Sequence, residues 1–396
     1  MKTAYKLQGK HRHYDWGGKT FLPNLTQVQN VDQKPFAEYW MGAHPSAPSL
    51  IETEQGELPL DTLIQQHPLQ WLGKKTNDAF GMLPYLFKVL DVEKMLSIQV
   101  HPSKKNAEIG FDIEQTKGIA IDAFNRNYKD RNHKPEVMVA LSDFWLLHGF
   151  LAPELLEARL QDYFYFNPLM DHFRGVDYQG LYSFFMNLST EDADHILKPL
   201  MLDAIASVKS GSVDKTHPHW WANKYYSGNM PEQSIDKGIF SIYILNIVHV
   251  PKYEGVFQGA GLLHAYLEGQ NIELMANSDN VLRGGLTPKH VDIDELLNHI
   301  RFVPTYPELL MGEELNINER TFSCPVPDFG LTKIAISEGE TYTIHPTSLE
   351  MLLVTEGAIL VNDLTVKAGE VALLLPTTAT LIKGLLTSVV FKSFVP

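Results

Sequence analysis

The sequence predicts a mainly β protein that is interrupted by a helical segment, and three observations lead to this prediction. Short apolar runs bounded by Pro, Gly and Asn-Asp turns fill the chain up to about residue 150 and return from about residue 239. Between them, apolar residues recur at helical spacing. The layout is therefore β, then α, then β, and 396 residues are enough for two or three cores.

The first 150 residues predict strands joined by loops. The clearest strands are the runs at 84–92, 95–100 and 136–141, which are rich in β-branched, aromatic and other apolar side chains. A further apolar run at 238–250 predicts a buried strand after the helical segment.

The segment 151–235 predicts a mainly helical insert. In 189–211 the apolar residues follow helical spacing, S-T-E-D forms an acidic start, and Gly211 is a plausible stop. The run A-P-E-L-L-E-A-R-L at 152–160 shows the same pattern. The last sixty or so residues return to short apolar runs between turns, which predicts an antiparallel sandwich or barrel.

The composition excludes several classes of protein. With 47 acidic and 33 basic residues the formal charge is −14, so nucleic acid would be repelled, although a pocket with a few cations still suits a small anion. The one cysteine, Cys324, excludes an internal disulfide and a multi-Cys metal cluster. The first residues lack the apolar region of a signal peptide, and no apolar run approaches the about 18 residues of a membrane span. We therefore expect a cytoplasmic protein.

One octapeptide, M-L-S-I-Q-V-H-P at 95–102, places polar and apolar residues in alternation. Ser97, Gln99 and His101 would share one strand face, because successive side chains point to opposite faces. Two other short motifs, His11-x-His13 and His217-x-His219, show no such alternation. The middle motif is therefore the strongest of the three as a metal site, although a half-exposed strand with its polar face in water explains it equally simply.

Further donors and cations lie elsewhere in the chain. A catalytic zinc site takes about three protein ligands, and Glu136 and His264 offer donors at the edges of apolar runs. Spacing alone does not join these segments. Arg283 and Lys289 lie in a glycine-rich, loop-like stretch that suits either an anion or solvent. Glu273 is a carboxylate within an apolar run, which is either hydrogen-bonded for structure or tuned for proton transfer.

Taken in order, four motifs resemble the type I phosphomannose isomerase family: M-L-S-I-Q-V-H-P, H-K-P-E, L-L-H-A-Y-L-E-G and M-A-N-S-D-N-V-L-R-G-G-L-T-P-K. The stretches Y-D-W-G-G and A-E-Y-W-M-G-A-H-P fit its N-terminal part. The resemblance implies a cupin-type β-barrel or sandwich core, a helical insert and a C-terminal, cupin-like β domain. It implies the divisions 1–150 and 236–300 for the catalytic domain, 151–235 for the insert and 301–396 for the last domain.

The resemblance also implies a site and a reaction. One zinc per chain would be held by Gln99, His101, Glu136 and His264. The reaction would interconvert mannose 6-phosphate and fructose 6-phosphate through a cis-enediol or enediolate, in carbohydrate metabolism that includes the supply of GDP-mannose. The implied catalytic residues are Arg283 as the cation and Lys134 and Glu273 for proton transfer; the implied substrate contacts are Trp16, Lys88, Ser97, Asp279 and Lys289.

Three further expectations accompany this reading. The chain would act as a monomer on a small phosphosugar, without nucleic acid or membrane as a partner. A cupin metal oxygenase with a redox-active iron is the alternative within enzymes, and a phosphosugar-binding cupin without catalysis is the alternative outside them. The direction of the pathway, mannose breakdown or glycan precursor supply, stays open because the reaction is reversible.

Overall fold

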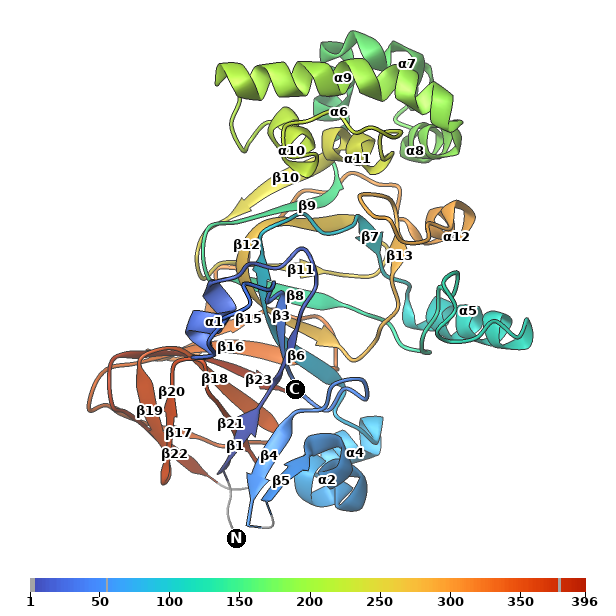
Figure 1. Ribbon diagram of the computed structural model, residues 1–396. Coiled ribbons are helices and arrows are strands. Elements are labelled where there is room, and N and C mark those ends of the chain that lie inside the picture. The colour runs from blue at the N-terminus through green and yellow to red at the C-terminus, as the bar shows by residue number, and fades with distance from the viewer. Residues whose placement is uncertain (1–3, 55, 377–378) are drawn as a thin grey trace.

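The computed structural model describes residues 4–54, 56–376 and 379–396, and its architecture is mainly β with a helical cap. Figure 1 shows helices α6 to α11 at one end, a curved sheet in the middle and the C-terminal strands at the other end. Within the described residues the strands form sheets of ten, nine and four strands. The predicted β-α-β layout and mainly β fold are thus confirmed.

The ten-stranded sheet is the curved sheet in the middle of the molecule (Figure 1). Its main path runs β10 (Leu245–Val250), β9 (Phe144–Phe150), β12 (His264–Ala276), β6 (Tyr85–Val92), β3 (Glu38–Met41) and β2 (Lys10–Arg12), and β7 (Gln99–Val100), β8 (Glu136–Ala140), β11 (Gly255–Gln258) and β13 (Leu282–Arg283) pair beside it. The long strand β12 is the centre of this sheet. Its first residues pair with β9 and β7, and its last residues pair with β6 and β8.

Gly269 marks the bend where β12 changes partners. Its φ is +127°, and an added Cβ would lie 2.7 Å from the carbonyl oxygen of Asp143. Only glycine adopts such a backbone at no steric cost. The strand can therefore curve and join both groups of strands.

Strand β6 shows how alternation separates the core from the interior of the curved sheet. Tyr85, Phe87 and Val89 pack with the C-terminal strands in one apolar cluster. Lys88, on the opposite face, lines a cavity. All eight residues of β6 are buried, which is why the run reads as continuously apolar in sequence.

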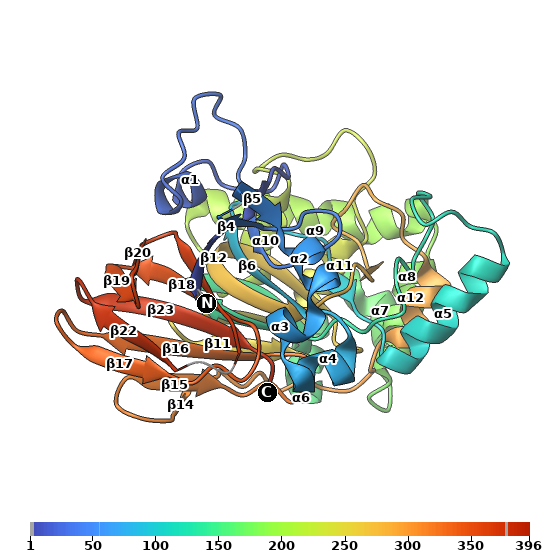
Figure 2. The same cartoon turned by 90° about the horizontal axis from the view of Figure 1, so that it is seen from below.

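The C-terminal part is a two-sheet sandwich, one of the two architectures, sandwich or barrel, that the sequence predicted. The nine-stranded sheet has the order β14 (Glu313–Glu314), β15 (Glu319–Phe322), β16 (Gly330–Ile336), β23 (Ser388–Phe394), β18 (Glu350–Glu356), β21 (Val371–Leu374), β1 (Ala4–Gln8), β4 (Leu50–Thr53) and β5 (Gly56–Pro59). The smaller sheet has the order β17 (Thr341–Ile344), β22 (Thr380–Gly384), β19 (Ala358–Val361) and β20 (Leu364–Lys367). Figure 2 shows the C-terminal strands of both sheets, β14 to β23, gathered on one side of the molecule. Three N-terminal strands therefore complete a C-terminal sheet, and the division of the chain into domains stays a prediction.

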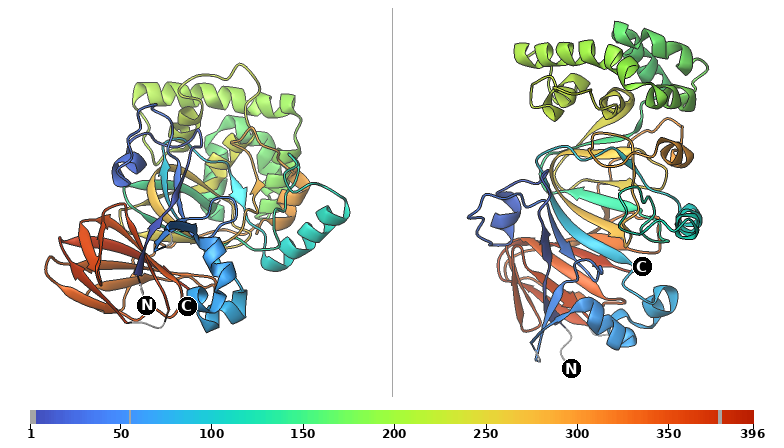
Figure 3. Two further views of the ribbon diagram at one scale, coloured as in Figure 1. Left: turned by 60° about the horizontal axis from the view of Figure 1, so that its bottom comes forward. Right: turned by 45° about the vertical axis from the view of Figure 1, so that its right-hand side comes forward.

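The helical cap contains α6 (Pro153–Asp162), the 3₁₀ helix η1 (Phe164–Phe166), α7 (Asn167–Phe173), α8 (Tyr178–Asn187), α9 (Thr190–Ser210), α10 (Pro218–Tyr225) and α11 (Gly238–Ile244). Figure 3 shows the cap from two further directions. The prediction of a helix in 189–211 is confirmed, since Ser189 accepts a hydrogen bond from the Asp192 N–H and Gly211 ends the helix in a left-handed conformation. The helices run on to Ile244, beyond the predicted limit of the insert.

Two local predictions were wrong. The run 238–250 is not one strand, because its first half forms α11 before β10 begins. Every residue of α11 is buried, so its sequence carries no helical alternation to separate it from a buried strand. In the run 95–100 only the last two residues are in a strand, since the N–H groups of Leu96 and Ile98 bond irregularly to the carbonyls of Tyr266 and Gly285.

Several helices outside the cap were not predicted. They are α1 (Phe21–Leu25), α2 (Leu60–Gln66), α3 (Pro68–Leu72), α4 (Lys74–Phe80), α5 (Lys104–Thr116) and α12 (Ile293–His299). Most of them span only about two turns, too short for a clear periodic pattern. Among the described residues, none of the helices has the length and apolar character needed to cross a membrane.

Candidate metal centre and active site

Three buried donors converge on one point inside the curved sheet. His101 Nε2 lies 3.3 Å from Glu136 Oε1, and His264 Nε2 lies 3.4 Å from Glu136 Oε2. The three ligand atoms lie within 4.8 Å of one another, and each side chain is at most 2% exposed. Segments far apart in sequence thus form one cluster of two imidazoles and a carboxylate.

Strand pairing explains this convergence. His264 opens β12 and pairs with Gln99 of β7, while Gln99 also pairs with Arg283 of β13. Residues directly opposite one another in antiparallel strands share a face. His264, Gln99 and Arg283 therefore form a row across three strands, and His101 follows two residues after Gln99.

The hydrogen bonds of the two histidines test whether the cluster fits a metal. His101 Nδ1 lies 2.8 Å from the Asn280 carbonyl, and His264 Nδ1 lies 2.9 Å from the Leu262 carbonyl. Because a carbonyl only accepts, each Nδ1 must carry a hydrogen, and in a neutral imidazole the Nε2 then presents a lone pair. Neither Nε2 has a hydrogen-bond partner among the described residues. Buried nitrogens left in this state beside a carboxylate fit a zinc ion.

Electrostatics keep the donors in the form that binds a metal. Burial lowers the pKa of His101 to about 4, so its imidazole is neutral near pH 7. Burial alone would raise the pKa of Glu136, but the nearby ammonium of Lys134 acts against it, and that pKa lies well below its ordinary range. The Lys134 Nζ lies 3.3 Å from Glu136 Oε1. The cluster thus carries an ionised Glu136 and a neutral His101 near pH 7.

A cavity of about 1370 Å³ adjoins this cluster. Eight of the predicted site residues line it: Trp16, Lys88, Ser97, Gln99, Lys134, Asp279, Arg283 and Lys289. Its lining contains six Lys or Arg and four Asp or Glu residues, in contrast to the net charge of −14 for the whole chain. Among the described residues, Arg283 and Lys289 have no ion-pair partner within 4 Å. The cavity therefore suits an anionic ligand.

Glu273 lies behind the lining of this cavity. Its Oε1 accepts a hydrogen bond from Lys88 Nζ at 3.0 Å, and its Oε2 accepts one from the Tyr266 hydroxyl at 2.9 Å. Burial raises the pKa of Glu273 above its ordinary value. Burial lowers the pKa of Lys88, but Glu273, Glu38 and Glu136 outweigh it and hold that pKa above its ordinary value. Glu273 and Lys88 thus form a buried ion pair beside the cavity.

Some residues of the site were missed from the sequence. Glu38 and Trp40 line the cavity from β3, and His44 lies 3.3 Å from Asp279. The segment 223–228 at the end of α10 adds Asn223, Lys224, Tyr225, Tyr226, Ser227 and Gly228 to the wall. The alternation of Glu38 and Trp40 with Tyr39 and Met41, which pack in an apolar cluster, was the available signal.

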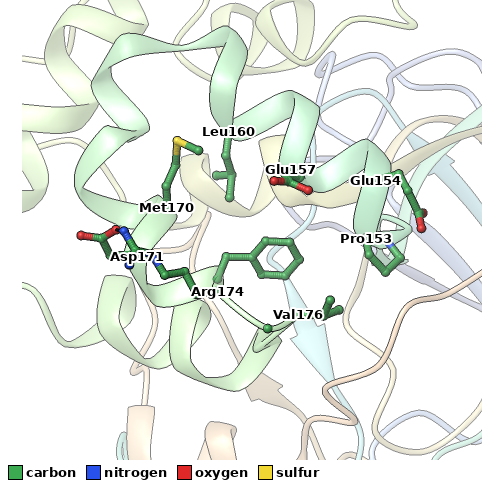
Figure 4. A pocket seen from close by; sticks show the side chains of 10 residues that line it. Pro153, Glu154, Glu157, Leu160, Met170, Asp171, Arg174 and Val176 are labelled. Atoms are coloured by element: carbon green, nitrogen blue, oxygen red, sulfur yellow. Dashed lines mark ion pairs between the residues drawn. The ribbon is translucent and has the colours of Figure 1, made fainter.

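The two competing histidine motifs take no part in the donor cluster and make ordinary contacts, although His13 lines the same large cavity and its Nδ1 lies 2.7 Å from the Pro35 carbonyl. His11 Nε2 lies 3.0 Å from the Thr26 hydroxyl, and His219 Nδ1 lies 2.8 Å from the Tyr243 hydroxyl. A second cavity, of about 460 Å³, lies within the helical cap (Figure 4), where Asp171 and Arg174 form an ion pair at 2.6 Å. None of the predicted site residues lines this second cavity.

Comparison with known proteins agrees with the geometry. Residues 4–152 match the family model "Phosphomannose isomerase type I, catalytic domain". The chain is 38% identical to mannose-6-phosphate isomerase of Salmonella typhimurium, over 93% of each chain. It is 38% identical to that of Escherichia coli, over 89% of this chain and 88% of the relative. A crystal structure described as mannose 6-phosphate isomerase in a holo, zinc-bound form covers 100% of both chains with a TM-score of 0.88 and 33% identity. The chain therefore belongs to the type I phosphomannose isomerase family.

Proposed function

We propose that the chain is a zinc-dependent aldose–ketose isomerase that interconverts mannose 6-phosphate and fructose 6-phosphate. The observation that carries this proposal is the buried cluster of His101, Glu136 and His264, which adjoins a large cavity rich in cations. The zinc-bound relative and the curated mannose-6-phosphate isomerases support it. The oxygenase and binding-only alternatives gain no support from these relatives.

The metal would be held by His101, Glu136, His264 and Gln99. Gln99 lines the cavity, so it would complete the donor set on the side that faces the substrate. When bound, zinc supplies a Lewis acid that stabilises negative charge developing on the sugar oxygens. The neutral amide of Gln99 leaves more positive charge on the metal than a thiolate or carboxylate ligand would.

The chain's own residues would move the protons and stabilise the charge. A proton leaves C2 of the open-chain sugar and is delivered to C1, while a proton is exchanged between the oxygens of these two carbons. Arg283, which pairs with Gln99 across neighbouring strands and has no ion-pair partner within the described part of the chain, would stabilise the enediolate. Proton transfer would fall to Lys134 and Glu273. Lys134 lines the cavity and Glu273 reaches it only through Lys88, so direct contact with the sugar favours Lys134.

The remaining predicted contacts would orient the substrate. We assign Ser97 and Lys289 as the phosphate ligands, because both line the cavity and Lys289 forms no ion pair with any residue that the structure describes. The charge of Lys88 is already balanced by Glu273, which makes Lys88 the weaker phosphate ligand. Asp279 would accept a hydrogen bond from a sugar hydroxyl, and Trp16 would form an apolar wall.

The direct test is to incubate the zinc-loaded protein with mannose 6-phosphate and follow fructose 6-phosphate with a coupled dehydrogenase, in a sealed cell with an oxygen electrode. We expect fructose 6-phosphate to form with no oxygen uptake. Oxygen uptake without the isomer would identify an oxygenase. Saturable binding of the phosphosugar without either reaction would identify a binding protein, and both outcomes overturn the proposal.

We further propose that the protein acts as a cytoplasmic monomer that requires neither nucleic acid nor a membrane. The acidic net charge supports this for nucleic acid. All residues proposed for the site come from one chain, so catalysis needs no second copy. Light scattering on the eluting peak of a size-exclusion column should give the mass of one chain, 44.8 kDa.

A further inference from the structure

The side chain of Asn280 joins two segments that approach the proposed metal centre from different directions. It is fully buried. Its Oδ1 accepts hydrogen bonds from the main-chain N–H groups of Lys129 at 2.7 Å and Asp130 at 3.2 Å. Its Nδ2 donates to the main-chain carbonyls of Asp130 and Asn132, both at 2.8 Å. The amide is thus fixed on both its oxygen and its nitrogen side.

The main chain of the same residue contacts a proposed zinc ligand. The Asn280 carbonyl accepts the hydrogen bond from His101 Nδ1 at 2.8 Å. That bond sets the tautomer of His101 and the direction in which its Nε2 lone pair points. The position of the Asn280 carbonyl therefore decides whether His101 faces Glu136 and His264.

Both joined segments also lead directly into the site. The segment 129–132 runs on to Lys134 and Glu136, and Asn280 comes just before β13, which carries Arg283. One further contact between the segments is the hydrogen bond from Asn132 Nδ2 to the Asn277 carbonyl, at 3.1 Å. A change at Asn280 would therefore shift the His101 acceptor relative to the strand that carries Glu136.

We propose that Asn280 is a positioning residue for the metal centre: its buried amide holds the main-chain carbonyl that orients His101, and in this way it raises the affinity for zinc. The inference rests on the proposed zinc-dependent function. Removing a partner that orients a metal ligand typically weakens metal binding by about 10- to 100-fold.

Two variants and a matched control test this role. Asn280→Ala removes all the side-chain bonds. Asn280→Asp keeps the volume and the acceptor for Lys129 and Asp130, but it places an oxygen against two carbonyls in place of the Nδ2 donor. The control Asn132→Ala removes the side-chain bond to Asn277 between the same two segments and leaves the carbonyl that faces His101 untouched.

The first measurement is the dissociation constant for zinc, obtained by adding zinc to the metal-free protein in competition with a fluorescent chelator. The second is the melting temperature of the metal-free protein. We expect both Asn280 variants to bind zinc about 10- to 100-fold more weakly than the wild type. We expect the zinc dissociation constant of Asn132→Ala to stay within about threefold of the wild-type value, even where its melting temperature is lower. If Asn280→Ala does not fold, Asn280→Asp decides the test.

Three outcomes separate the possible failures. A wild-type dissociation constant in a folded Asn280 variant would overturn the positioning role and leave the zinc centre standing. Equal losses of affinity in Asn132→Ala and the Asn280 variants would show that general loosening of the segments is responsible, which also overturns it. Failure of the wild type itself to bind zinc would instead overturn the proposed function, together with the inference that rests on it.

Discussion

Arg283 is the residue whose replacement should separate catalysis from metal binding. It lines the cavity and pairs with Gln99 across neighbouring strands, but it is not one of the three clustered metal donors. We expect Arg283→Ala to lower kcat by about 10²- to 10³-fold, because it removes a fixed cation from the developing enediolate. Zinc content should stay at one per chain.

The measurement is kcat with mannose 6-phosphate beside zinc analysis of the same sample. Arg301, an exposed arginine, supplies the matched control, and Arg301→Ala should turn over normally. Arg283→Lys should recover only part of the loss, since an ammonium does not reproduce the planar guanidinium. Near-normal kcat in Arg283→Ala would remove Arg283 from the mechanism.

Glu350 should make stability depend on pH. It is 3% exposed, and burial raises its pKa to about 7 from an ordinary 4.5. The folded state therefore favours the neutral carboxyl, so its stabilisation is complete below about pH 4.5 and is lost as the pH rises through about 7. Glu350→Gln keeps the acceptor for the Thr347 N–H without the buried charge. We expect it to raise the free energy of unfolding at pH 8 by about 1–3 kcal/mol.

Urea titrations at pH 5 and pH 8 would check this. The gain should be much smaller at pH 5, where most of the wild-type carboxyl is already protonated. Glu338→Gln, at an exposed position of the same sandwich, is the control and should change the unfolding free energy little at either pH. An equal effect of Glu350→Gln at both pH values would rule out the buried charge as its cause.

At the scale of elements, α9 provides a prediction about helix capping. The Ser189 hydroxyl accepts a hydrogen bond from the Asp192 N–H at 3.0 Å at the start of this 21-residue helix. We expect Ser189→Ala to lower the free energy of unfolding by about 1 kcal/mol, because one N–H loses its acceptor. Ser189→Thr keeps a hydroxyl and should lose less. The comparison is made by urea titration, and equal stability of Ser189→Ala and the wild type would mean that the cap contributes nothing.

The elements also show what a sequence pattern can and cannot predict. Helix α9 was predicted because its apolar residues keep helical spacing over a long stretch, and strands β6 and β8 were predicted because each is a continuous apolar run. Helix α11 was misread as a strand because burial on all sides removes its period. The polar alternation of Ser97 and Gln99 did point to the cavity, although most of that stretch bonds irregularly and only its end is a strand.

At the scale of the whole molecule, long-range pairing decides the fold and the site. Strand β1 pairs with β21, which lies more than 350 residues later in the chain, and no local pattern predicts this. The convergence of His101, Glu136 and His264 depends on β12 pairing with both β7 and β8. Spacing did not join these donors, and only the resemblance to a known family implied that they share one ion.

The central claim is that this cluster is a catalytic zinc centre. The measurement that tests it most directly is a zinc titration of the metal-free protein in which turnover of mannose 6-phosphate is recorded at each addition. We expect no turnover without metal. The rate should then rise linearly with added zinc and stop rising at one zinc per chain. His264→Ala, and Gln99→Ala in parallel, should lose zinc and turnover together. Full turnover in the metal-free protein, or one tightly bound zinc with normal turnover in His264→Ala, would contradict the account.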